Sequence, residues 1–132
     1  MKNLTLIIPA KNEKESLPTV LRELKNKNCE IKIIVDRSDI ATINAISKFK
    51  CKLIFQDKKG YGNALIKGIN SVKTKYFCIF NADGSFNPNE LPKMLKKIQL
   101  NNYDFIFASR YEKNSGSEDD TIVTYIGNFI FT

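Results

Sequence analysis

Residues 76–85 read Tyr-Phe-Cys-Ile-Phe-Asn-Ala-Asp-Gly-Ser. The apolar run at 76–80 predicts a short buried strand, and the acidic turn that follows would end it. In open α/β sheets, ligands bind just beyond the carboxyl ends of strands. A carboxylate such as Asp83 between small neighbours suits a hydrated divalent cation that carries phosphate oxygens. Asp-Gly after a strand is also an ordinary turn signal, so this stretch alone leaves both interpretations open.

Working outward, strand-like and helix-like segments alternate along the chain. Short apolar runs predict strands at 4–8, 31–35, 52–55, 76–80 and 105–108. Amphipathic segments predict four helices: one capped by Ser16, one over 38–49, one opening near Gly60, and one starting at 87–90 with Leu91, Met94, Leu95 and Ile98 inward. This order predicts a mostly parallel sheet with helices on both faces and right-handed crossovers.

Composition narrows the possible functions. The 132 residues fit one domain, and the net charge of +7 comes from scattered lysines rather than a basic cluster with stacking aromatics. Nucleic-acid binding is therefore disfavoured, while anionic ligands or lipid headgroups are favoured. The chain has no histidine, so a metal site would be rich in oxygen and would suit Mg²⁺ or Mn²⁺. Three cysteines without paired spacing fit a reducing cytosol.

Notable residues follow several of the expected strands. Residues 9–13 follow the first strand, Asp36 follows the second, and 81–83 follow the fourth. Because parallel strands end at one edge of the sheet, these residues should meet there, with Asp36 able to accept hydrogen bonds from a base or ribose. Gly60 and Gly62 would let the backbone approach a phosphate at a helix N-terminus. The loop matches neither the dinucleotide fingerprint nor the P-loop.

Five motifs in order carry a family resemblance. They are Ile-Pro-Ala-Lys-Asn-Glu at 8–13, Ile-Val-Asp at 34–36, Gly-Tyr-Gly-Asn-Ala at 60–64, Asn-Ala-Asp at 81–83 and Ala-Ser-Arg-Tyr at 108–111. Together they resemble the family 2 glycosyltransferases, and are most similar to the branch of dolichol-phosphate mannose synthases and polyprenyl-phosphate glycosyltransferases. The resemblance covers nearly the whole chain.

The resemblance implies an α/β fold of the GT-A type: a three-layer α/β/α, Rossmann-like nucleotide-diphospho-sugar transferase. A divalent metal, Mg²⁺ or Mn²⁺, would help to bind the donor. Carried over by position, the residues bordering the nucleotide would be Pro9, Lys11, Glu13, Asp36, Gly60, Gly62, Asn81, Ala82 and Asp83. The residues near the metal would be Asp83, Asn81 and Ser85. Asp83 and Arg110, which faces the phosphates, would be the catalytic pair.

The chain departs from the family pattern in three places. Lys11 stands where the family usually has tyrosine, and 36–39 read Asp-Arg-Ser-Asp instead of Asp-Asp-Gly-Ser. Asn81 replaces the first acid of the D-x-D element, and losing one unit charge at ~4 Å forfeits roughly 1–4 kcal/mol of attraction for the metal. Arg37 can offset that loss by touching phosphate, or can be a solvated residue at a helix start.

The leading functional hypothesis is an inverting hexosyltransferase. It would transfer sugar from a UDP- or GDP-linked donor to a polyprenyl phosphate (dolichyl or undecaprenyl) at the cytoplasmic face of the membrane, with peripheral membrane contact. A phosphate acceptor is already an anion and needs no strong general base, which agrees with a chain lacking histidine. One alternative is a weakly active or inactive nucleotide-sugar-binding module, motivated by Asn81. Another is a sugar-phosphate nucleotidyltransferase, but residues 10–16 lack the glycine- and arginine-rich loop it needs.

The chain is expected to contain a nucleotide-sugar-binding core over 1–111. Residues 112–132 are expected to form a loop and the start of a helix on the acceptor side, over 122–131. No capping signal follows that segment, so the chain looks cut, and the 132 residues are expected to bind donor without necessarily being active alone.

Overall fold

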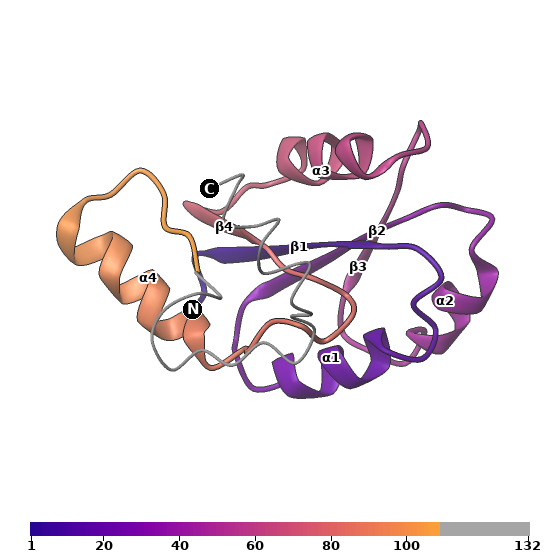
Figure 1. The fold of residues 1–132 in the computed structure, drawn as a ribbon, viewed down its shortest axis with the longest axis horizontal. Helices are drawn as coiled ribbons and strands as arrows, with labels where there is room; N and C mark the ends of the chain where they lie inside the picture. Colours follow the sequence, from indigo (N-terminus) through magenta and orange to yellow (C-terminus); the bar gives the residue numbers. More distant parts are fainter. Residues whose placement is uncertain (109–132) are drawn as a thin grey trace, which may run out of the picture. The chain divides into compact units, whose positions relative to one another are not determined.

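The structure is a computed structural model that describes residues 1–108 (Figure 1). Its strands are β1 (Leu4–Ala10), β2 (Glu30–Val35), β3 (Lys52–Phe55) and β4 (Tyr76–Ile79). Its helices are α1 (Leu17–Leu24), α2 (Ile40–Ala45), α3 (Tyr61–Asn70) and α4 (Glu90–Asn101). The chain divides into two compact units, Met1–Lys96 and Lys97–Thr132, and the whole sheet lies in the first.

The four described strands form one parallel sheet in the order β3-β2-β1-β4. Strand β1 is central: it pairs with β2 from Thr5 to Ala10 and with β4 from Leu4 to Ile7. The chain first builds outward from β1 to β3 and then crosses back to place β4 on the other side. The strand order therefore reverses between β1 and β4, and α/β folds bind ligands at that kind of point. The predicted parallel α/β fold is confirmed.

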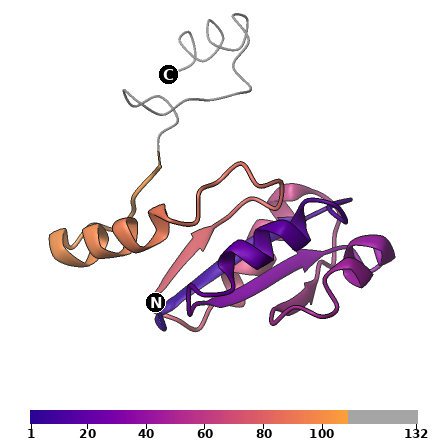
Figure 2. The same ribbon diagram turned by 90° about the horizontal axis from the view of Figure 1, so that it is seen from below.

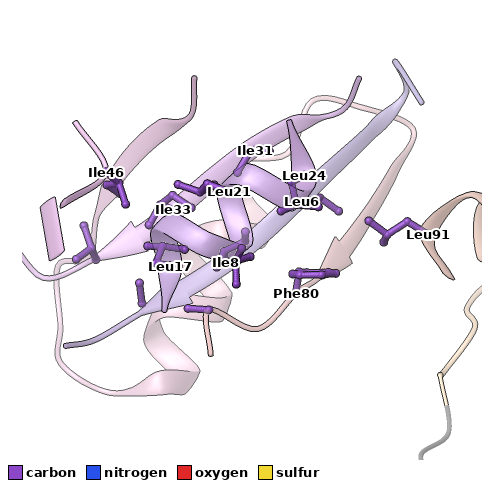
Figure 3. Close-up of a cluster of buried hydrophobic side chains, with 14 of the residues drawn as sticks. Leu6, Ile8, Leu17, Leu21, Leu24, Ile31, Ile33, Ile46, Phe80 and Leu91 are labelled. Carbon is purple, nitrogen blue, oxygen red and sulfur yellow. The ribbon is translucent and has the colours of Figure 1, made fainter. Parts of the chain in front are cut away.

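Helices cover both faces of the sheet, as the alternating pattern predicts. Figure 1 shows α3 on one face and α1 and α2 on the other, and Figure 2 shows α1 in front of the sheet. On the α1 face, Leu17, Leu21 and Leu24 meet strand residues such as Leu6 and Ile8 in the larger core cluster (Figure 3). These β1 residues alternate with Ile7, which faces α3.

Helix α3 packs on the sheet at very close range. A Cβ at Gly68 would lie 2.4 Å from Ile7 Cγ2 and 3.1 Å from Ile34 Cδ1. Only a residue without a side chain fits, because real Cβ atoms essentially never approach another atom that closely. Ala64, one turn earlier, completes the small cluster with Ile7 and Ile34. Gly68 thus sets the distance between α3 and the sheet.

Several local expectations need correction. Helix α1 starts directly after Ser16, but the Ser16 hydroxyl donates to Glu13 Oε2 and makes no cap to the helix. Helix α2 spans six residues rather than the expected 38–49, because turns bonded three residues apart, such as Phe49 N–H to Ile46 O, replace the helix after Ala45. Strand β4 ends at Ile79, one residue early, and β1 runs two residues further, to Ala10.

The expected strand at 105–108 is also wrong. These residues form no strand, and none of the described strands pairs with them. An apolar run becomes a strand only where a neighbour's edge completes its hydrogen bonds. Here the Phe105 and Phe107 rings pack on each other instead, with centroids 5.3 Å apart. In α4, Leu91 is buried as expected, while Met94, Leu95 and Ile98 are only half-buried.

The cysteines are free thiols, and Cys78 behaves as a small core residue. Burial raises the pKa of Cys78 to about 11. Among residues 1–108, no helix has the length and apolar character needed to cross a membrane.

Candidate functional site

The site begins where β1 and β4 stop pairing. The Ile7 carbonyl accepts the Phe80 N–H at 2.9 Å, and this bond closes the ladder. Pro9, two residues on, has the same side of its backbone turned toward β4 because strand residues alternate. It has no N–H to donate, although it still lies in register with Ile34 of β2. The proline therefore ends pairing with β4 where the strand order reverses, which places the residues after both strands at one edge.

The loop after β1 is tied to the start of α2. The N–H of Asn12 donates to Asp39 Oδ2 at 2.7 Å, and the N–H of Glu13 donates to Thr42 Oγ1 at 2.9 Å. Asp39 also caps α2, since its Oδ1 accepts the Thr42 N–H at 3.2 Å. Burial raises the pKa of Asp39, but the hydrogen bonds from Asn12 and Thr42 outweigh it and hold that pKa below its usual value. Lys11 and Glu13 are thus carried on an anchored loop.

Asp36 lies directly after β2 at the same edge. Its Oδ1 accepts both the N–H and the hydroxyl of Ser38, at 2.9 and 2.7 Å. These bonds, with smaller contributions from the charges of Lys59 and Lys11, hold the pKa of Asp36 below its usual value. Asp36 is therefore an ionised carboxylate near neutral pH with one oxygen held by Ser38. That Lys11 and Asp36 border one ligand stays a prediction.

Arg37 is exposed, which agrees with the prediction of a solvated residue at a helix start, while its contact with phosphate stays a prediction. Its guanidinium carbon lies 4.3 Å from the centroid of the Phe55 ring at the end of β3. This cation–π contact holds a positive charge beside the loop after β3. Asp57 in that loop pairs with Lys67 of α3 at 2.6 Å, and chiefly for this reason its pKa is lowered.

The two glycines near the start of α3 differ in what they require. Gly60 has φ of +111°, a conformation that side-chain-bearing residues rarely adopt, so the turn into the helix needs it. A Cβ at Gly62 would meet nothing within 4 Å. Nothing in the described fold therefore demands a glycine at 62, and the position is open to a close external approach.

The turn after β4 brings its predicted metal residues together. Asn81 Nδ2 donates to Ser85 Oγ at 3.1 Å, and Asp83 Oδ1 accepts the Ser85 N–H at 2.9 Å. Asp83 is exposed, and Gly84 follows it with φ of +82°. Ala82 differs from its neighbours because its methyl group is buried in the core, so only its backbone can face a ligand.

These residues fit a weakly held, hydrated divalent ion. The side chains of Asp83, Asn81 and Ser85 supply a carboxylate, an amide and a hydroxyl, all oxygen donors of the kind Mg²⁺ and Mn²⁺ prefer. Among residues 1–108, no three histidine, cysteine, aspartate or glutamate side chains gather into a metal-binding group. An ion here would therefore need oxygens from water and phosphate as well.

Two surface hollows flank this edge. One, of about 440 Å³, is lined by Glu23 and by residues 84–89, directly beyond Asp83. The other, of about 500 Å³, lies beside α3 and includes Asp57, Asn63 and Lys67 in its lining. Neither hollow is lined by Lys11, Asp36 or Asp83. The candidate site is therefore defined by its charged and polar side chains and not by a hollow.

Sequence reasoning overlooked Asp39 and Thr42 as parts of the site. Their spacing, a cap residue followed three residues later by threonine, signals a helix start but not a bond to a loop 27 to 29 residues away. Arg110, the predicted phosphate-facing residue, lies outside the described residues, as do the expected acceptor-side helix at 122–131 and the loop before it.

Comparison with known proteins identifies the family. A dolichol-phosphate mannosyltransferase of Pyrococcus furiosus is 30% identical over 125 residues, covering 88% of this chain and 35% of its own length. An uncharacterized protein of Methanocaldococcus jannaschii is 27% identical over 129 residues, covering 94% of this chain and 53% of its own. The chain thus spans about half the length, or less, of these curated relatives.

A solved structure supports the fold. Mannosyl-3-phosphoglycerate synthase from Rubrobacter xylanophilus aligns with a TM-score of 0.59 at 14% identity, covering 67% of this chain and 33% of that one. At that identity the likeness concerns the fold alone. The profile of glycosyl transferase family 2 matches residues 5–130, which is nearly the whole chain. The chain therefore belongs to glycosyl transferase family 2.

Proposed function

We propose that this protein is a glycosyltransferase that binds a nucleotide-diphospho-sugar at the edge where β1, β2 and β4 end. The family match over residues 5–130 is the observation that carries the proposal. The arrangement of the site supports it, because three loops with polar and charged side chains emerge where the strand order reverses.

Within this site, Asp36 accepts a hydrogen bond from the base or ribose. Its second oxygen, Oδ2, makes no hydrogen bond with any described residue, whereas Oδ1 is held by Ser38. Lys11 and Glu13 border the nucleotide from the loop after β1, with Pro9 at its base. Gly60 and Gly62 let the diphosphate approach the N-terminus of α3, whose backbone amides and dipole favour negative charge.

Asp83, with Asn81 and Ser85, would hold a divalent ion, which would supply positive charge to offset the charge developing on the departing nucleoside diphosphate. The protein's own contribution is to place the carboxylate in a tight turn through the Ser85 N–H, at 2.9 Å. Arg110 faces the same phosphates in this proposal and stabilises the same charge.

The acceptor is proposed to be a polyprenyl phosphate, with inversion at the anomeric carbon. Support comes from the Pyrococcus furiosus relative, which is a dolichol-phosphate mannosyltransferase. Such an acceptor would place the reaction at the cytoplasmic face of a membrane, with the protein in peripheral contact with it. A phosphate anion needs no strong general base, which suits a chain without histidine.

Calorimetric titration tests donor binding. UDP and GDP, each with and without Mn²⁺, are titrated into the protein, and the same nucleotides into an Asp36→Asn variant. We expect at least one nucleotide to bind, more tightly with Mn²⁺, and binding to weaken about tenfold in the variant because an acceptor at the base or ribose is lost. Absence of binding by both nucleotides would overturn the proposal.

Asn81 favours one second candidate, a nucleotide-sugar-binding module without catalysis. Its amide brings no charge to the position where the family has its first acid, so metal binding is weakened. This candidate predicts nucleotide binding but no hydrolysis or transfer of the sugar. Turnover of a UDP- or GDP-linked sugar, followed as released nucleoside diphosphate, would exclude it.

A further inference from the structure

Two consecutive backbone amides in the loop after β1 are held by side chains of the N-cap residue and the first turn of α2. Asn12 donates to Asp39 and Glu13 donates to Thr42, at 2.7 and 2.9 Å. The two acceptors lie three residues apart and therefore share one face of the helix. Asn12 has φ of +60°, a conformation that asparagine tolerates but that still needs support from its surroundings.

Capping of α2 does not account for all the hydrogen bonds that the side chains of Asp39 and Thr42 make. One oxygen of Asp39 already accepts the Thr42 N–H, which is the ordinary cap, and the second oxygen reaches out to Asn12. The Thr42 side chain is fully buried, and its hydroxyl oxygen accepts the Glu13 N–H. Together these contacts join the loop that carries Lys11 and Glu13 to the segment that carries Asp36.

We infer that Asp39 and Thr42 are positioning residues that hold the donor-binding loop in its bound conformation before the nucleotide arrives. This inference rests on the proposed function, because it assigns the clamp a role at that donor site. A loop already ordered in the free protein loses less conformational entropy on binding, so a clamped loop binds the same ligand more tightly. The two residues touch backbone, not substrate, and act through Lys11, Glu13 and Asp36.

An Asp39→Asn variant separates the cap from the clamp. Asparagine caps helices about as well as aspartate, so α2 keeps its start. Asp39 uses a different oxygen for each of the two amides, and asparagine replaces one of these oxygens with an NH2 group, which is a donor and cannot accept from the facing N–H. The Thr42→Val variant removes the acceptor for the Glu13 N–H at nearly constant side-chain volume. The Thr42→Ser variant keeps the hydroxyl and should preserve this hydrogen bond.

The experiment measures the Kd of UDP and GDP with Mn²⁺ by calorimetry, well below the unfolding temperature, with amide hydrogen exchange at Asn12 and Glu13 in the free protein. In Asp39→Asn and Thr42→Val we expect faster exchange at those amides and a Kd raised about tenfold, chiefly through a less favourable binding entropy. Thr42→Ser should bind like the unaltered protein. Asp57→Asn is the matched control, since it removes the same charge from an exposed ion pair.

The possible outcomes separate the two claims. If the unaltered protein binds neither nucleotide, the proposed function is overturned and the donor role of the clamp with it. If it binds and the Kd is the same in Asp39→Asn and Thr42→Val, this inference alone is overturned. Equal weakening in Asp57→Asn would also overturn it, because the loss would then follow from charge rather than from the clamp.

Discussion

The two ends of the sheet use similar polar side chains in opposite ways. Toward the amino ends of the strands, Glu30 Oε1 accepts from Lys52 at 2.7 Å and Oε2 accepts from Thr5 at 2.9 Å, and Lys32 Nζ lies 3.6 Å from Oε2. At the carboxyl edge, Asp36 and Asp39 accept from backbone amides, and neither forms a salt bridge with any described residue.

The difference separates a stabilising network from a binding site. A carboxylate paired with lysine has its charge neutralised within the protein and has little left to offer a ligand. A carboxylate held by amide dipoles stays negative and keeps its charge available. Carboxylates therefore stabilise the fold at one end of the sheet, while at the other end we propose that Asp36 borders the ligand and Asp39 positions the loop.

Helix α3 spans both ends, and its two glycines give the largest expected effect. Gly68→Ala should destabilise the protein by about 2–3 kcal/mol, because the new methyl group would overlap Ile7 Cγ2, which lies 2.4 Å from its position. Gly62→Ala, the same substitution in the same helix, has open space and should be neutral or stabilising by up to about 1 kcal/mol. Urea unfolding measures both free energies.

For nucleotide binding we expect the opposite ranking, with Gly62→Ala more affected than Gly68→Ala. Gly62→Ala is expected to weaken UDP or GDP binding, because the backbone at the carboxyl edge has to approach phosphate, while folded Gly68→Ala should bind as the unaltered protein does. Equal unfolding midpoints for the two variants would contradict the close approach of α3 to the sheet.

The second largest effect concerns the stabilising network. Glu30→Ala leaves the Lys32 ammonium, whose side chain is only 6% exposed, with the Ser71 carbonyl as its remaining partner among residues 1–108. A buried charge that loses its partner is costly, and because Glu30 is itself 23% exposed we expect about 2 kcal/mol of destabilisation. Lys52→Ala is the control: Lys52 is 71% exposed and should cost less than about 1 kcal/mol.

Thermal and urea unfolding measure the loss of stability. Nucleotide titration tests whether the effect is confined to the amino end of the sheet. Both variants should bind nucleotide normally at temperatures where they are folded. Weakened binding in Lys52→Ala would mean that the two ends of the sheet are not independent.

Sequence patterns predict the sheet well because burial imposes them. The runs at 4–8 and 31–35 lie within the two central strands, which are almost wholly buried, and the run at 52–55 forms an edge strand that is exposed or half-buried. The run at 105–108 has the same local character but no strand partner among the described residues. The apolar pattern of a segment indicates that it tends to be buried. It does not show whether the edge of a neighbouring strand is free to pair with that segment.

The site is only partly predictable for a related reason. That Asp36 and Asp83 follow strands is visible in the sequence, and so is their shared edge once the sheet is taken as parallel. That Asp39 reaches Asn12 is not visible, because the contact depends on how two loops pack. Gly68 was likewise missed, since a glycine inside a helix shows its reason only when the atoms above it are known.

A smaller effect is expected from restoring a charge at the carboxyl edge. Asn81→Asp should tighten Mn²⁺ binding about fivefold, equivalent to about 1 kcal/mol, because a second carboxylate attracts the ion through water-like screening. The turn should tolerate the change, since the Ser85 hydroxyl can turn from accepting to donating. Paramagnetic titration of Mn²⁺ in the presence of nucleotide measures the affinity.

Asn70→Asp on the exposed end of α3 is the control for a general charge effect. It should leave the Mn²⁺ affinity unchanged. Equal tightening in both variants would show that the ion responds to net charge rather than to a site at the turn after β4.

The smallest expected effect is the pH dependence of stability at the amino end. Hydrogen bonding from Lys52, chiefly, holds the pKa of Glu30 below its usual value of 4.5 in the folded protein. The unfolded state therefore takes up this proton first, so the stabilisation is complete above about pH 4.5 and is lost as pH falls through the folded pKa. Glu30→Gln should flatten the fall in unfolding free energy between pH 5 and pH 3 without changing nucleotide binding at pH 7. An equally steep fall in the variant would place the acid-sensitive carboxylates at the carboxyl edge, and the two ends of the sheet would then have exchanged the roles argued for them.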